Sequence, residues 1–128
     1  MIQLNGQALA YIGDAVFELQ IREYLLSNQL TRVNDLHKEA IKYTSAVSQA
    51  KIVDYILESL SEEEIDIYKR GRNAKETHKP KNASLNEYRK ATGLESLIGY
   101  LYLNKNDSRL TEIIKKSIEY INEENGRI

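Results

Sequence analysis

Near its amino terminus the chain reads Ala8-Leu9-Ala10-Tyr11-Ile12-Gly13-Asp14-Ala15-Val16-Phe17, an apolar stretch in which Asp14 is the only charge. Within this stretch and just beyond it, apolar residues recur at steps of three, four and three, namely Leu9, Ile12, Val16 and Leu19. Residues spaced in this way share one face of a helix, so we expect a helix from about Asn5 to about Leu26.

A second apolar stretch with one acid occurs later, at Leu94-Glu95-Ser96-Leu97-Ile98-Gly99-Tyr100-Leu101-Tyr102-Leu103. Both stretches contain a glycine close to the acid, Gly13 in the first and Gly99 in the second. Glycine inside a helix costs about 1 kcal/mol relative to alanine, so it usually marks the close packing of another backbone. Two such helices in contact would place Asp14 and Glu95 around one divalent cation.

The pattern by itself favours a plainer alternative for the two acids. Asp14 lies off the apolar face of its helix and can simply face water. A helix break at Gly93 would make Glu95 a first-turn acid, which the helix dipole favours.

The rest of the chain also predicts helices, and we expect an all-α fold. The second expected helix covers about Arg32 to Lys42, with Thr31 as N-cap and with Val33, Leu36, Ala40 and Ile41 facing inward, and the third starts at Thr44 or Ser45 and has an apolar stripe of Val47, Ala50, Ile52, Val53, Ile56 and Leu57. The fourth runs from Ser61 to about Arg72 and begins with a Ser61–Glu64 capping box, and the fifth runs from Ser84 to Leu103. The last helix follows the Asn104–Asp107 turn, with Leu110, Ile113, Ile114, Ile118 and Ile121 facing inward.

Length and composition set further limits. The 128 residues are typical of one domain, 1–128, and six Gly with a single Pro argue against a β-sandwich or barrel. The absence of Cys excludes disulfides, thiolate metal sites and a cysteine nucleophile. No apolar run reaches the roughly 18 residues of a membrane span, and the amino terminus does not resemble a signal peptide. We therefore expect a soluble cytoplasmic protein without a membrane partner.

Charge is distributed unevenly along the chain. The segment from Lys69 to Lys90 holds eight Lys or Arg against two Glu, a net +6, whereas the remaining residues hold 10 basic and 17 acidic side chains, a net −7. Such a local positive field attracts an anionic partner. The part from Asn73 to Ala83 has no helical periodicity and is expected to form an exposed loop. Candidate phosphate-binding residues are Lys69, Arg70, Arg72, Asn73, Lys75, Lys79, Lys81, Asn82 and Arg89. A merely solvated charged loop fits this composition equally well.

The same residues resemble motifs of the ribonuclease III family. Residues 9–19 resemble its signature helix, and residues 95–103 resemble its second acidic motif. The segments Arg70-Gly71-Arg72-Asn73-Ala74-Lys75, Pro80-Lys81-Asn82 and Tyr88-Arg89-Lys90-Ala91-Thr92 are similar to the small bacterial form of the family, which has a catalytic domain and no double-stranded-RNA-binding domain.

The resemblance implies a ribonuclease III-type helical endonuclease domain that works as a homodimer, with the first helix in the interface. It implies Mg²⁺ held by Asp14 and Glu95 and hydrolysis of double-stranded RNA to 5′-phosphate and 3′-hydroxyl ends, with a two-nucleotide 3′ overhang. The positively charged segment would contact the RNA. The implied substrate is a precursor of large-subunit (23S) ribosomal RNA, and a large-subunit ribosomal protein is a candidate partner.

The sequence also departs from the family pattern. Ordinary members supply two acids from each motif, but here the first acids correspond to Ala10 and Thr92, and an earlier glutamate corresponds to Gln7. Much of the Mg²⁺ coordination shell would then be water or phosphate oxygen.

Two other functions are compatible with these motifs. The first is a catalytically inactive dimer that binds structured RNA, whose binding would be indifferent to Asp14→Asn. The second is a helical protein-interaction adaptor whose basic loop meets an acidic partner, without preference for duplex RNA.

Overall fold

A computed structural model describes residues 4–74 and 82–126 of the chain. These residues form α-helices and one turn of 3₁₀ helix, without a strand, so the all-α prediction is confirmed. The elements are α1 (Gly6–Ser27), α2 (Val33–Thr44), α3 (Ala46–Ile56), η1 (Leu57–Ser59), α4 (Glu62–Arg72), α5 (Leu85–Leu103) and α6 (Asp107–Glu124). In the described ranges, no helix combines the length and the apolar character needed to cross a bilayer.

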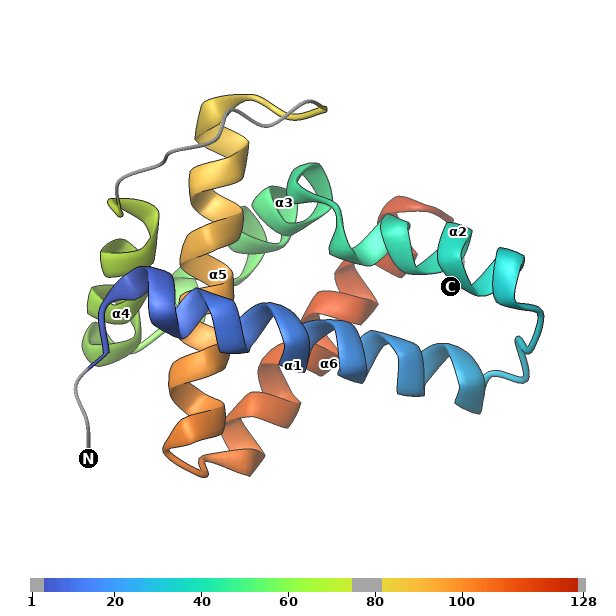
Figure 1. The fold of residues 1–128 in the computed structure, drawn as a ribbon, viewed down its shortest axis with the longest axis horizontal. Coiled ribbons are helices and arrows are strands. Elements are labelled where there is room, and N and C mark those ends of the chain that lie inside the picture. The colour runs from blue at the N-terminus through green and yellow to red at the C-terminus, as the bar shows by residue number, and fades with distance from the viewer. Residues whose placement is uncertain (1–3, 75–81, 127–128) are drawn as a thin grey trace.

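Helix α5 is the centre of the fold. It packs against α1, α3, α4 and α6, and α1 crosses in front of it in Figure 1. Nine of its residues are buried, and Leu94, Leu97, Ile98 and Leu101 belong to the apolar core. A helix that is apolar on most of its surface is stable only when surrounded by other helices, which explains its central position.

Local side-chain caps explain where several helices begin. The predicted capping box is present at α4, where the Ser61 backbone N–H donates to Glu64 Oε1 at 2.9 Å and the Glu64 N–H donates to Ser61 Oγ at 3.1 Å. Ser84 and Glu87 form a second capping box at α5, and Ser45 caps α3, close to the expected helix start at Thr44 or Ser45. Helix α2 has no side-chain cap; its N-cap is Arg32, so the prediction for Thr31 is wrong.

Four residues of the predicted apolar faces are exposed. Val33 and Ile41 are 65% and 60% exposed, and α2 instead buries Ala40 and Tyr43. Leu19 of α1 and Leu57 are also exposed. Periodicity identifies an apolar face, but whether another element covers that face is decided by tertiary packing.

The break expected at Gly93 does not occur, because α5 runs continuously through it. A Cβ added at Gly93 would lie 2.6 Å from the Tyr68 ring, so this glycine makes room for α4. Glu95 consequently lies in the middle of α5, and its interpretation as a first-turn acid is wrong. Of the expected loop from Asn73 to Ala83, residues 75–81 lie outside the described residues.

Candidate active site

Two glycines allow the backbones of α1 and α5 to touch where the helices cross. A Cβ added at Gly13 would overlap the carbonyl oxygen of Glu95 and lie 2.8 Å from the backbone N of Gly99. A Cβ added at Gly99 would overlap the carbonyl oxygen of Leu9. The close approach predicted from these glycines is therefore confirmed, and it places the two acid-bearing segments against each other.

At this crossing the carboxylates of Asp14 and Glu95 lie close enough together for the charge of Asp14 to act on Glu95. Asp14 is exposed and Glu95 is half-buried, so the pair opens to solvent on the side of α1. The alternative in which Asp14 simply faces water is correct about its exposure, but Asp14 also lies beside Glu95.

The pairing changes the protonation of Glu95. Burial, the negative charge of Asp14 and the hydrogen bond to Asp14 raise the pKa of Glu95 to about 9, in that order of importance, against a smaller opposing effect of Gln49. Two carboxylates this close cannot both be charged at low cost, so the raised pKa keeps Glu95 protonated at neutral pH unless a cation is present. Carboxylate oxygens are also the ligands that Mg²⁺ and similar hard cations prefer, so the residues fit a divalent metal ion.

Gln49 is a third member of the site that the sequence interpretation did not identify. It lies in the first turn of α3, is buried, and its side chain opposes the rise in the pKa of Glu95. The sequence does contain a signal for it. Gln49 is a polar residue on the same helical face as the core residues Ile52, Val53 and Ile56, and a polar residue on such a face needs a buried partner.

Ala10 and Thr92 stand at the two positions where the family pattern has a further acid, and neither supplies a carboxylate. Ala10 is buried, and the hydroxyl of the buried Thr92 donates to the Tyr88 carbonyl oxygen at 3.0 Å. Across residues 4–74 and 82–126, no three His, Cys, Asp or Glu side chains gather in a group that could hold a metal ion. Within these ranges the acid pair therefore stands without a third carboxylate.

The described members of the predicted phosphate-binding set lie at the end of α4 and the start of α5. Lys69, Arg70, Asn73, Asn82 and Arg89 are exposed. Arg72 is half-buried, with its guanidinium 5.7 Å from the centre of the Tyr68 ring, and its Nε donates to Asn73 Oδ1 at 3.2 Å. Lys75, Lys79 and Lys81 lie outside the described residues.

A junction of three helices ties this basic end of α4 to the segment that carries Glu95. The buried Ser96 hydroxyl shares its one proton between the carbonyl oxygens of Gly6, at 2.7 Å, and Thr92, at 2.9 Å. A Cβ added at Gly71 would overlap the Ser96 side chain, so α4 and α5 are in close contact there. Arg70 and Arg72 flank Gly71, and Ser96 directly follows Glu95. The packing of Gly71 against Ser96 therefore fixes the position of these two arginines relative to Glu95.

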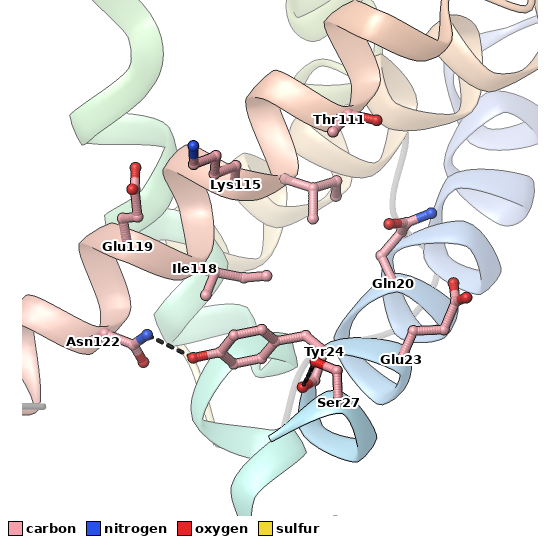
Figure 2. Close-up of a pocket in the computed structure, with 10 residues that line it drawn as sticks. Gln20, Glu23, Tyr24, Ser27, Thr111, Lys115, Ile118, Glu119 and Asn122 are labelled. Atoms are coloured by element: carbon pink, nitrogen blue, oxygen red, sulfur yellow. Dashed lines mark hydrogen bonds between the residues drawn. The ribbon is translucent and has the colours of Figure 1, made fainter. Parts of the chain in front are cut away.

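A groove of about 680 Å³ lies elsewhere, between the second half of α1 and α6 (Figure 2). Tyr24 crosses this groove, and its hydroxyl accepts a hydrogen bond from Asn122 Nδ2 at 2.8 Å. None of the predicted site residues lines it. The groove is therefore separate from the carboxylate pair.

Comparison with known proteins identifies the family. Residues 7–106, which include Asp14, Gln49 and Glu95, match the Ribonuclease III domain. The Mini-ribonuclease 3 of Enterococcus faecalis is 50% identical, covering 98% of this chain and 96% of that protein, and the Mini-ribonuclease 3 of Clostridium tetani is also 50% identical, covering 94% and 81%. A crystal structure of a Fusobacterium nucleatum protein superposes with a TM-score of 0.84 at 36% identity, covering 90% of this chain and 93% of that one. The chain belongs to the ribonuclease III family, among its Mini-ribonuclease 3 members, and is an endoribonuclease.

Proposed function

We propose that this chain hydrolyses double-stranded RNA with Mg²⁺ held by Asp14 and Glu95. Members of the ribonuclease III family act on double-stranded RNA and use a divalent metal ion. The observation that carries the proposal is the pairing of Asp14 with Glu95 at the α1–α5 crossing, because two acids 81 positions apart in the sequence meet there at a surface open to solvent.

The reaction is metal-assisted hydrolysis of a phosphodiester. When bound, Mg²⁺ supplies positive charge that lowers the pKa of water and offsets the charge of the phosphoryl oxygens. Asp14 and Glu95 would hold this ion, Asp14 from the exposed side and Glu95 from the buried side. Water adds to phosphorus and the bond to the 3′ oxygen breaks, which leaves a 5′-phosphate and a 3′-hydroxyl.

Residues 1–128 would work as one catalytic domain that also binds the RNA. The proposed contacts to phosphates and 2′-hydroxyls are Lys69, Arg70, Arg72, Asn73, Lys75, Lys79, Lys81, Asn82 and Arg89. Two observations support this assignment: most of the described members are exposed, and Gly71, which lies between Arg70 and Arg72, packs against Ser96 beside Glu95.

We further propose that two copies associate through α1. Three large apolar side chains on one face of this helix are exposed, namely Tyr11, Leu19 and Leu26, at 84%, 57% and 53%. An exposed apolar stripe of this kind marks a protein–protein interface. The face includes Ala15 and adjoins Asp14, so a dimer built on α1 would bring two carboxylate pairs to one duplex, one for each strand.

The proposed natural substrate is a structured precursor of 23S ribosomal RNA, with a large-subunit ribosomal protein as an additional partner. Family membership supports both, and this substrate corresponds to a cytoplasmic enzyme.

The proposal is tested by incubating a labelled RNA duplex with Mg²⁺ and the wild type, Asp14→Asn or Glu95→Gln. The wild type is expected to cleave and to stop when EDTA is added. Each variant should lower the cleavage rate about 100-fold or more, equivalent to about 3 kcal/mol of lost transition-state stabilisation. Asp107→Asn, at an exposed acid of α6, is the matched control and should cleave normally.

The other outcomes are equally informative. A normal rate for Asp14→Asn or Glu95→Gln removes that residue from the site. Intact duplex in every lane, together with a clear binding shift, identifies an inactive RNA-binding dimer. Equal binding of duplex RNA and unrelated polyanions without cleavage identifies the adaptor.

A further inference from the structure

We propose that the groove between α1 and α6 is a docking site for a helical segment of a partner protein, one that carries Lys or Arg on both sides of an apolar face (Figure 2). This inference goes beyond the proposed function, because none of the proposed catalytic or RNA-binding residues lines the groove.

The shape of the groove fits a helix. Its walls are two helices, α1 from Gln20 to Ser27 and α6 from Thr111 to Asn122. At 1.5 Å per residue, the α6 wall is about 16 Å long, which equals about three helical turns. The volume of about 680 Å³ has room for several large side chains. A helix that docks in such a groove places apolar side chains from successive turns against its floor.

The floor of the groove is apolar and fixed in position. Tyr24 and Ile118 pack on the core but are only half-buried, and Ile114 is buried beneath them. Asn122 Nδ2 donates to the Tyr24 hydroxyl at 2.8 Å, so the Tyr24 ring is held across the groove. Apolar side chains of a partner would remove this surface from water, which favours binding.

The edges of the groove set the charge of the partner. Glu23 on α1 and Glu119 on α6 lie at opposite edges and are both exposed (Figure 2). Within the described part of the chain, neither glutamate takes part in an ion pair. Lys115 is the one cation in the described lining, so two acids stand against one base. Lys or Arg on both sides of an apolar helix face would meet the two glutamates.

The distribution of charge over the whole chain favours the same partner. The segment from Lys69 to Lys90 carries a net +6, and the rest of the chain, which includes the groove, carries a net −7. A cationic segment is therefore attracted to the groove and repelled by the basic segment, whereas a nucleic acid experiences the opposite forces. Charge thus selects a protein segment rather than RNA for the groove.

The experiment measures the binding of a labelled peptide to the full chain by fluorescence anisotropy, without RNA. The probe is a peptide of about 15 residues made of Leu, Ala and Lys, with Leu at helical spacing and Lys on both sides of the Leu face. The wild type should bind this peptide. Amide NMR shifts should change along Gln20 to Ser27 and along Thr111 to Asn122.

Variants of the edges and of the floor test the two parts of the argument. Glu23→Lys and Glu119→Lys should each weaken binding about 3-fold or more, and the double variant about 10-fold or more. Ile118→Ala should weaken binding about 10-fold, because it removes part of the apolar floor. Thermal unfolding verifies that each variant folds. Should Ile118→Ala not fold, the two glutamate variants still test the site, because both residues are exposed.

The matched control is Glu58→Lys. Glu58 is an exposed acid of η1 that does not line the groove, so this variant has the same net charge as Glu23→Lys. It should bind the peptide within about twofold of the wild type. Two control peptides, one with the same composition but without helical spacing of Leu and one with Glu in place of Lys, should bind at least about 10-fold more weakly.

Several results would overturn the assignment. Equal weakening by Glu58→Lys, or equal binding of the peptide without helical spacing, would show that net charge alone attracts the probe. Preference for the Glu peptide would assign the groove to an acidic partner, and shifts confined to other helices would place the probe elsewhere. A wild type that ignores the peptide, and whose dimer dissociates in Ile118→Ala and Glu23→Lys, would assign the groove to a second copy. None of these results depends on RNA cleavage, so they leave the proposed function untouched.

Discussion

The side chains of Glu64 and Arg109 form the most extensive ion pair among the described residues. Arg109 Nε donates to Glu64 Oε2 at 2.7 Å, its Nη2 donates to Glu64 Oε1 at 2.8 Å, and Nη2 also donates to the Ser59 carbonyl oxygen at 2.8 Å. Glu64 is buried, so this bidentate ion pair fixes the start of α4 against the start of α6.

This pair predicts a specific dependence of stability on acid. The hydrogen bond from Arg109 lowers the pKa of Glu64 below its ordinary 4.5, despite burial. The unfolded state then binds more protons than the folded state near that pH. The stabilisation is therefore complete above pH 4.5 and is lost as the pH falls through the lower, folded-state pKa.

Arg109→Ala should lower the free energy of unfolding by about 3 kcal/mol at pH 7, because it leaves Glu64 buried without its partner. It should also flatten the loss of stability below pH 4.5. Urea unfolding at pH 7 and at pH 3.5 measures both effects. Lys42→Ala removes the ion pair between the exposed Lys42 and the half-buried Glu39 and should change stability by about 0.5 kcal/mol or less. Equal effects of the two substitutions would contradict the argument.

Helices α1 and α5 behave as one unit because their backbones touch at Gly13 and Gly99. Alanine normally stabilises a helix interior by up to about 1 kcal/mol over glycine. Gly13→Ala should instead lower the free energy of unfolding by about 2 kcal/mol or more, since the new methyl group meets the Glu95 backbone rather than a flexible side chain. By pushing α1 away from α5, it should also abolish cleavage in any population that remains folded.

The measurement is chemical unfolding together with duplex cleavage. Gly126→Ala is the control, because its added methyl group meets nothing and is disfavoured only by the positive φ of 69°. That variant should lose about 1–2 kcal/mol at most and keep full activity. A Gly13→Ala variant that is as stable and as active as the wild type would show that α1 and α5 can move apart at Gly13 without loss, which contradicts the argument.

At the scale of the whole molecule, the uneven distribution of charge predicts that the affinity for RNA falls as the salt concentration rises. Lys69→Ala and Arg70→Ala should each reduce the slope of log K against log salt by about 1, because each removes one phosphate contact. Lys115→Ala, at an exposed cation on α6 in the groove of Figure 2, should leave the slope unchanged. Binding titrations at several salt concentrations measure the slopes. Unaltered slopes in the first two variants would place the phosphate contacts elsewhere.

The exposed apolar face of α1 makes a prediction about assembly. Leu19→Glu should convert a dimer into monomers, because a charge would be buried in the interface. Analytical ultracentrifugation detects the change. Leu57→Glu, at an exposed apolar residue of η1, is the control and should leave the dimer intact. A wild type that is monomeric at all concentrations, or a dimeric Leu19→Glu, would contradict an interface on α1.

Local patterns predicted much of the fold and part of the site. The helices and the Ser61 capping box were accessible, because helix hydrogen bonds and caps join residues three or four apart. The glycines near Asp14 and Glu95 indicated a close crossing of two helices, but the pattern by itself favoured two separate, solvent-facing acids. The family resemblance singled out the same two acids, and the family match covers both.

The sequence by itself determined that this chain forms helices, where most of them begin and end, and which two acids stand out from apolar surroundings. Only the tertiary structure decided which apolar faces are covered, since Val33, Ile41 and Leu19 have helical spacing but are exposed. It also decided that Gln49 of α3 affects the pKa of Glu95, because these residues lie on helices far apart in the sequence. Periodicity is a property of one helix, whereas burial and the partners of buried polar groups depend on how several helices pack.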